Sequence, residues 1–262
     1  MSIARDLAAD HALLIEAVEE AGALARRFFE TGFKSWEKYP DDPVSEADIA
    51  VDKLLRERLL AARPDYGWRS EESTAQKGSG ARTWVVDPID GTRAFVAKKP
   101  EFAVSLALME AGRPVAGAVF NPATDELFEA VRGGGARRNG QVMRASIRTD
   151  LSSARLLASQ RTFEKNRWIE RTPGASFHYM NSIAYRMARV AAGDFEAAIS
   201  MTEKNDWDVA AAHLLLEEAG ACCSAVTGEA LSYAVAGARL PSVLASAPGV
   251  HDILVGMLKS RA

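Results

Sequence analysis

Two aspartates stand three residues apart at the end of an apolar run. Residues Trp84–Thr92 read WVVDPIDGT and contain Asp87 and Asp90. The apolar run and the proline predict a buried strand that ends in a sharp turn. Pro88 fixes one φ angle and Gly91 permits close backbone approach, so both carboxylates and an intervening carbonyl can converge on one point. A pocket with only oxygen ligands favours Mg²⁺ over zinc or copper.

The Gly91-Thr92 pair that follows has chemistry of its own. Backbone amides at a turn that opens a helix, together with the Thr92 hydroxyl, could hold a phosphate beside a metal ion. Asp-Pro and Asp-Gly are also ordinary turn dipeptides, so this stretch alone leaves a purely structural role open. Two further carboxylate clusters, in the segments 71–73 and 207–208, favour the chemical interpretation.

These three segments resemble the signature blocks of a known enzyme family. Glu71-Glu72-Ser73, Asp87–Thr92 and Trp207–Ala211 look like the blocks of the inositol monophosphatase family of Mg²⁺-dependent, lithium-sensitive phosphatases, and they stand in the same order. The resemblance extends over most of the chain. It implies an α/β fold with an α+β N-terminal half, built as a layered αβαβα sandwich, and it implies a homodimer.

The resemblance also implies roles for single residues. Asp48 and Thr92 would polarise the attacking water, and Glu71 would serve both catalysis and metal binding. Two or three Mg²⁺ ions would be held by Glu71, Asp87, the Ile89 carbonyl, Asp90 and Asp208. The substrate phosphate would be contacted by Ile89, Asp90, Gly91, Thr92, Ser182 and Asp208. Judged without the family, Asp48 is a first-turn helix acid and Asp208 a helix-capping residue.

The first half of the chain supplies helices that position these groups. Apolar residues at spacings of three, four and seven predict a helix over residues 3–29, closed by a glycine. Residues 33–43 lack a pattern and predict a loop, which in the family folds over the metals. Ser45 with Asp48 three residues later predicts the start of a second helix, which stops at Pro64.

Strands follow the central block, and the pattern changes near residue 150. Before that point, alternating or apolar runs predict an antiparallel meander over residues 102–109, 114–120 and 126–131, with 143–146 a candidate strand to close the sheet. After it, strands at 156–158, 195–200 and 242–246 alternate with helices at 183–192, 209–219 and 248–259, which is typical of an α/β unit. We therefore expect two units, residues 1–148 and 149–262, with the site at their junction.

Composition limits the classes of function. The 262 residues are 48% hydrophobic and 26% charged with a net charge of −3, which is ordinary for a soluble globular protein. This balance argues against a binder of duplex nucleic acid, because such proteins carry basic stripes. No stretch approaches the ~20 apolar residues of a membrane span, and the first residues, MSIARD, lack the apolar run of a signal peptide. We expect a cytoplasmic protein that acts on a small phosphate ester, with no membrane partner.

Residues after the central block bear on the substrate. The segments 91–95 and 98–102 are similar to the Gly-Thr-Lys-Glu-Phe and Gly-Glu-Phe pattern of the bacterial 3′(2′),5′-bisphosphate nucleotidases. Arg93, Lys98 and Lys99 add positive charge that a second phosphate could use, or they are solvated surface charges. The resemblance implies hydrolysis of the 3′-phosphate of adenosine 3′,5′-bisphosphate.

Two departures from the family pattern keep alternatives open. The inositol enzymes carry a glutamate seven residues before the Trp-Asp aspartate, where this chain has Met201, with Glu203 two residues away. The family's Gly-Ser/Thr segment near the substrate is here Asn181-Ser182-Ile183. Inositol 1-phosphate, histidinol phosphate or a sugar phosphate are therefore alternative substrates, and a Mg²⁺-binding module without turnover is the alternative from another class.

Overall fold

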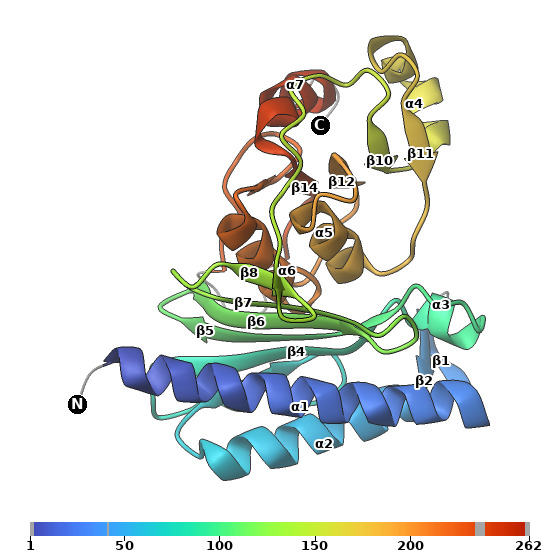
Figure 1. The fold of residues 1–262 in the computed structure, drawn as a ribbon. Coiled ribbons are helices and arrows are strands. Elements are labelled where there is room, and N and C mark those ends of the chain that lie inside the picture. Colours follow the sequence, from blue (N-terminus) through green and yellow to red (C-terminus); the bar gives the residue numbers. More distant parts are fainter. Residues whose placement is uncertain (1–2, 41, 234–238, 260–262) are drawn as a thin grey trace.

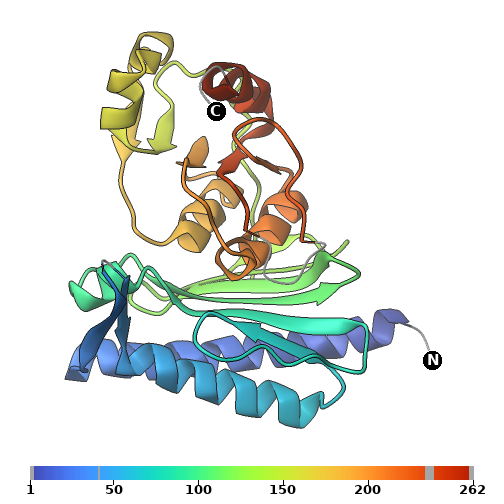
Figure 2. The ribbon, with the colours of Figure 1, turned by 180° about the vertical axis from the view of Figure 1, so that it is seen from behind.

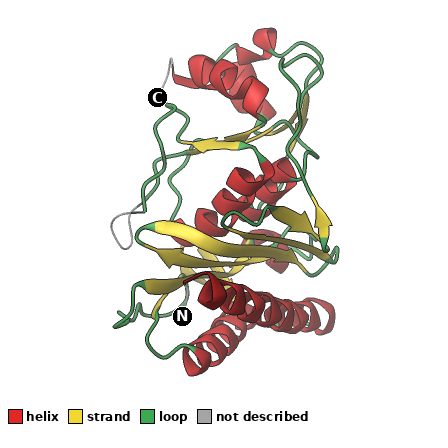
Figure 3. Cartoon of the chain, turned by 60° about the vertical axis from the view of Figure 1, so that its left-hand side comes forward, coloured by secondary structure: helices red, strands yellow, loops and turns green. Residues whose placement is uncertain are grey.

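Five layers of helices and sheets make up the computed structural model, which describes residues 3–40, 42–233 and 239–259 (Figure 1). At one end, helices α1 (Ile3–Thr31) and α2 (Glu46–Ala62) lie side by side against a seven-stranded sheet. Helices α5 (Ile183–Ala191) and α6 (Asp206–Ala219) form the middle layer. A five-stranded sheet and an outer helical layer complete the predicted αβαβα sandwich (Figure 3).

The larger sheet is built from one continuous part of the chain. Its strands are parallel only between the first two and antiparallel thereafter, as the meander predicts. In spatial order they are β3 (Gly67–Ser70), β4 (Arg82–Asp90), β5 (Ala103–Glu110), β6 (Arg113–Asn121), β7 (Glu126–Val131), β8 (Ala136–Arg138) and β9 (Gln141–Val142). The short helix α3 (Thr92–Val96) follows β4 directly.

The smaller sheet mixes parallel and antiparallel pairs. Its spatial order is β11 (Ser176–His178), β10 (Arg155–Leu157), β12 (Ala197–Ser200), β14 (Val243–Ser246) and β13 (Cys222–Ser224). The outer layer holds α4 (Gln160–Lys165), the 3₁₀ helix η1 (Trp168–Arg171) and α7 (Pro248–Leu258). The predicted division at 148/149 falls in the connection between the two sheets and stays a prediction.

Three hydrophobic cores separate the layers. One lies between α1, α2 and the first sheet, the second between that sheet, α5 and α6, and the third under α4 and α7. Strand alternation divides the smaller sheet between the last two cores: Leu156 packs in the outer core, whereas Leu157 packs against the middle helices. Within the described ranges, no helix is both long and apolar enough to span a membrane.

Most predicted elements are confirmed, and three expectations are wrong. Most of residues 33–43 are not a loop, because β1 (Ser35–Tyr39) and β2 (Asp42–Ser45) form an antiparallel hairpin beside α3 (Figure 2); residue 41 of the expected loop lies outside the described residues. Residues 143–146 form no strand, since β9 ends one residue earlier. The central strand β4 does not end at Pro88 but continues to Asp90.

Candidate active site

A bulge in β4 brings the two aspartates of the central block to one side. Residues three apart in a regular strand point to opposite faces. Opposite β5, however, Asp87 pairs with Ser105 whereas Asp90 pairs with Ala103, so β4 holds one extra residue in this interval. Such a bulge bends the strand and tolerates a proline, which cannot donate to the ladder. The bulge around Pro88 therefore lets the carboxylates of Asp87 and Asp90 point to the same side of the sheet, as the sequence pattern predicted.

Three carboxylates meet in front of this bulge. Glu71 follows β3, Asp87 lies in β4 and Asp208 lies in the first turn of α6, and each offers an oxygen within 4.8 Å of the others. Burial raises the pKa of Glu71 to about 8 and of Asp208 to about 7, and it raises the pKa of Asp87 well above its ordinary range. Negative neighbours add to each shift. The cluster therefore stores electrostatic repulsion that a cation would relieve.

Asp208 is both a helix cap and a member of the cluster. Its Oδ2 accepts a hydrogen bond from the Asn205 amide at 2.8 Å, which completes a capping box at the start of α6. The two interpretations of this residue from sequence are thus compatible. Next to it, the buried Asp206 forms an ion pair with Arg69 of β3, which ties the start of α6 to the strand preceding Glu71.

Asp90 lies slightly apart and is anchored to α5. Its Oδ2 accepts hydrogen bonds from the Ser182 hydroxyl at 2.6 Å and from the Ala184 amide at 2.5 Å. Ser182 is fully buried and also caps α5 by accepting from the Tyr185 amide. Its hydroxyl is thus committed to Asp90 and the helix, and the residue does not line the cavity described below. Burial raises the pKa of Asp90 as well.

Asp48 and Thr92 form the predicted pair. The Thr92 hydroxyl lies 3.1 Å from Asp48 Oδ1 and 3.0 Å from the Ile89 carbonyl oxygen, so it can donate to either. The second oxygen of Asp48 accepts from the amide and hydroxyl of Ser45, the N-cap of α2. Burial raises the pKa of Asp48, and these hydrogen bonds oppose the shift. The capping box therefore fixes the carboxylate that faces Thr92.

Gly91 makes the turn between β4 and α3 possible. Its φ of +93° is a left-handed conformation, and a Cβ added there would lie 2.9 Å from the Glu101 carbonyl oxygen. A side chain at this position is excluded on both counts. The tight turn brings the first amides of α3, which lack partners inside the helix, to the rim of the carboxylate cluster.

The β1–β2 hairpin adds a cation that the sequence did not single out. Lys38 lies 2.7 Å from Glu72 Oε1 and 3.6 Å from Glu71 Oε1. Burial lowers the pKa of Lys38, but the hydrogen bond to Glu72 and the charge of Glu71 outweigh it, so the pKa is raised. The two glutamates thus share one cationic partner.

A cavity of about 520 Å³ opens in front of these groups. It is lined from the first half by the central block and from the second half by α5, β12 and α6. Three cationic side chains, Arg93, Arg186 and Lys204, line it together with the carboxylates Asp42, Glu71, Asp87, Asp90 and Asp208. The cavity can therefore accept an anion once its carboxylates are neutralised.

The donor set fits Mg²⁺. All candidate ligands are carboxylate or carbonyl oxygens, and three of them lie close enough to share one ion. The pKa values of these carboxylates are raised in the absence of a cation, and a bound cation would lower them again. Glu71, Asp87 and Asp208 are the residues that would hold it, with Asp90 and the Ile89 carbonyl beside them on the same cavity.

Fold and site together define a metal-dependent phosphomonoesterase. The inositol monophosphatase family matches residues 6–255, and the chain belongs to this family. It is 39% identical over 219 residues to the inositol-1-monophosphatase of Rhizobium meliloti, covering 79% of this chain and 82% of that one. It is 33% identical over 227 residues to the histidinol-phosphatase of Chlorobaculum parvum, covering 82% and 85%.

A solved structure agrees over the whole fold. The extragenic suppressor protein SuhB of Bartonella henselae superposes with a TM-score of 0.86 at 29% identity, covering 97% of this chain and 100% of that one. These relatives are named as an inositol-1-monophosphatase, a histidinol-phosphatase and a SuhB protein. They therefore do not support our expectation that this chain belongs to the bisphosphate nucleotidase branch of the family.

The structure also weakens the charge argument for that branch. Lys98 Nζ lies over the rings of Phe29 and Phe33 and donates to the Phe29 carbonyl, away from the cavity. Neither Lys98 nor Lys99 lines the cavity, whereas Arg93 does. The two lysines therefore read as packing and surface charges.

Proposed function

We propose that this phosphatase uses Mg²⁺ to hydrolyse phosphate monoesters of small alcohols at the cavity between its two halves. The observation that carries the proposal is the convergence of Glu71, Asp87 and Asp208 within 4.8 Å. A phosphate dianion is repelled by such a cluster unless cations intervene. Bound Mg²⁺ would neutralise the carboxylates, bind the phosphate and lower the pKa of a water. Two or three ions per site are part of the proposal.

The chain's own groups position the reactants. Asp48, fixed by Ser45, accepts a hydrogen bond from the Thr92 hydroxyl, so that a lone pair of the Thr92 oxygen faces the attacking water and can accept a hydrogen bond from it. The amides of Gly91 and Thr92 bind phosphate oxygens. A bond forms from the water oxygen to phosphorus, the ester P–O bond breaks, and a proton lost by the water ends on the leaving alkoxide, so that the products are the alcohol and inorganic phosphate.

Two candidate substrates follow from the relatives. The Rhizobium enzyme is named for inositol 1-phosphate and the Chlorobaculum enzyme for histidinol phosphate. The position expected to hold inositol hydroxyls is Met201, and the nearby Glu203 is paired with Arg239 at 3.2 Å. Adenosine 3′,5′-bisphosphate stays a third candidate, supported by Arg93 at the cavity.

The experiment is a release assay with the three esters side by side. Phosphate release is measured at a few mM Mg²⁺, with EDTA and with lithium as separate arms. We expect phosphate release that requires Mg²⁺ and is inhibited by lithium. We also expect the protein to be a homodimer, and light scattering measures its mass. If the protein is folded and binds Mg²⁺ but releases phosphate from none of the esters, the proposal is wrong and the chain is a Mg²⁺-binding module without turnover.

A further inference from the structure

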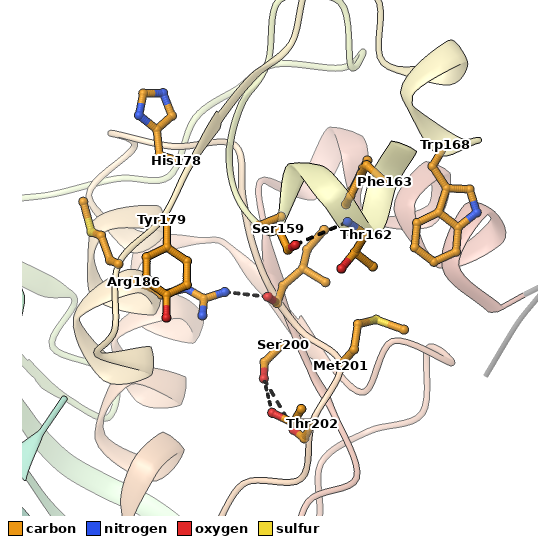
Figure 4. Close-up of a pocket in the computed structure, with 13 residues that line it drawn as sticks. Ser159, Thr162, Phe163, Trp168, His178, Tyr179, Arg186, Ser200, Met201 and Thr202 are labelled. Atoms are coloured by element: carbon orange, nitrogen blue, oxygen red, sulfur yellow. Dashed lines mark hydrogen bonds between the residues drawn. The ribbon is translucent and has the colours of Figure 1, made fainter. Parts of the chain in front are cut away.

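A second cavity of about 320 Å³ adjoins the carboxylate cavity (Figure 4). Phe163 and Trp168 lie on one side of it, Tyr179 and Arg186 lie on the other, and Met201 lies between them. We name it the side cavity. It shares Tyr179, Arg186, Ser200 and Thr202 with the carboxylate cavity, so one ligand can enter both.

Apolar groups contribute most of the surface of the side cavity, and Ser159, Thr162 and His178 are among the polar residues that also line it. Phe163 packs edge-on against Trp168 at 5.5 Å and against Phe177 at 4.9 Å, which makes this wall rigid. Met201, which is 40% exposed, supplies an adaptable apolar surface. An apolar cavity of about 150 Å³ already binds benzene, so a space of this size holds a ring and a short arm.

Arg186 forms a fixed boundary between the two cavities. Its Nη2 donates to the carbonyl oxygens of Leu157 and Ile199, which orients the guanidinium plane. A planar cation held in this way suits an ester oxygen on one side and the face of a ring on the other.

The side cavity lies on the half of the molecule opposite to the attacking group. Its wall comes entirely from residues 158–202, whereas Asp48 and Thr92 belong to α2 and α3. In-line displacement places the leaving group opposite the attacking water. The alcohol portion of the substrate would thus point toward the side cavity.

We propose that the side cavity binds the alcohol portion of the substrate and selects phosphate monoesters that carry a flat aromatic ring on a short arm. This inference rests on the proposed function and refines it. A ring buries apolar surface against Phe163, Trp168 and Met201. A polyol of similar size cannot use this apolar wall, and the hydroxyls of Ser159, Thr162 and Thr202 replace only part of the water that it loses, which disfavours it.

The test compares esters that differ only in the ring. 2-Phenylethyl phosphate and propyl phosphate have alkyl leaving groups of similar reactivity, and inositol 1-phosphate represents the polyols. We expect kcat/KM for the phenylethyl ester to exceed that of the propyl ester by about tenfold or more, mainly through a lower KM. Calorimetric titration with 2-phenylethylphosphonate and propylphosphonate in Mg²⁺ measures the same preference without turnover.

Two variants link the preference to the side cavity. Thr162→Trp fills the space and is expected to lower kcat/KM for the phenylethyl ester far more than for the smaller propyl ester, which abolishes the ring preference. Met201→Ala removes the exposed apolar wall and should reduce the preference several-fold. Ile253→Ala on α7 is the matched control, because Ile253 is 41% exposed and lies outside the cavity.

The outcomes separate the two proposals. Equal kcat/KM for both alkyl esters, or a preference that both cavity variants retain, would overturn the side-cavity assignment and leave the phosphatase intact. No release from any ester would overturn the proposed function instead. In that case the phosphonate titrations still decide whether the side cavity prefers a ring.

Discussion

At the scale of residues, repulsion between the buried carboxylates of the site is opposed by the hydrogen bonds that hold them in place. Asp87 Oδ1 accepts a hydrogen bond from the Ile89 amide at 3.0 Å, and the Asp87 carboxylate also offers an oxygen within 4.8 Å of Glu71 and Asp208. Without a cation, this arrangement costs stability, and the cost is the electrostatic driving force for metal binding.

Asp87→Asn tests this balance. The amide oxygen of asparagine can still accept from Ile89, so we expect a folded protein. Loss of one negative charge should stabilise the metal-free form by about 1 kcal/mol or more and reduce Mg²⁺-dependent turnover by at least about a thousandfold. Thermal unfolding with EDTA and phosphate release with Mg²⁺ are the measurements. A less stable metal-free variant with normal activity would contradict the assignment.

The pH dependence of stability follows from the same carboxylates. The pKa of Glu71 is raised to about 8 and that of Asp208 to about 7, both above the values of an unfolded chain. The folded state therefore binds more protons than the unfolded state between about pH 4 and 8, so stability falls as pH rises through this window. We expect the Tm in EDTA to fall from pH 5 to pH 8. A Tm that rises over this interval would be evidence against the repulsion.

At the scale of elements, the turn from β4 into α3 is the least tolerant segment of the site. Gly91→Ala combines a left-handed φ with a backbone clash at Glu101. Gly140→Ala is the control, because its φ is also positive, at +76°, but its added Cβ meets nothing within 4 Å. We expect about 1 kcal/mol of destabilisation at Gly140 and clearly more at Gly91, together with lost activity only at Gly91. Denaturant unfolding and the release assay measure both.

The elements that the sequence predicted are those with a period or a cap. The Ser45 capping box, the long helix α1 and the meander all carry local signals that the structure confirms. The β1–β2 hairpin carries no such local signal, because most of the residues of β1 are exposed. Its position depends instead on contacts with distant residues, such as the pair of Lys38 with Glu72. Three-residue strands such as β11 and β13 are too short to show alternation.

The candidate ligands of the site were predictable from the sequence, whereas the contacts that hold them in place were not. The three carboxylate blocks stand out by residue type and spacing, and the structure brings Glu71, Asp87 and Asp208 together. The Arg69–Asp206 pair joins residues far apart in the chain, and no local pattern announces it. The position of Ser182 under Asp90 likewise depends on how α5 docks.

At the scale of the whole molecule, the Arg69–Asp206 pair connects the first sheet to the middle layer. Asp206 is 1% and Arg69 12% exposed, so removal of one partner leaves a buried charge. We expect Arg69→Met or Asp206→Asn to cost about 3 kcal/mol each, and the double variant less than the sum. Arg26→Met at the exposed Arg26–Glu30 pair is the control, with an expected cost below about 1 kcal/mol. Additive costs at Arg69 and Asp206 would show that the pair is not coupled.

The middle layer belongs by sequence to the second half but packs on the sheets of both. Helices α5 and α6 share one core with the inner face of the first sheet and with strands of the second. Each half expressed alone would therefore expose a broad apolar surface and precipitate. We expect that two co-expressed fragments, residues 1–148 and 149–262, would form a soluble complex. Helices α5 and α6 would then form the interface between the two fragments.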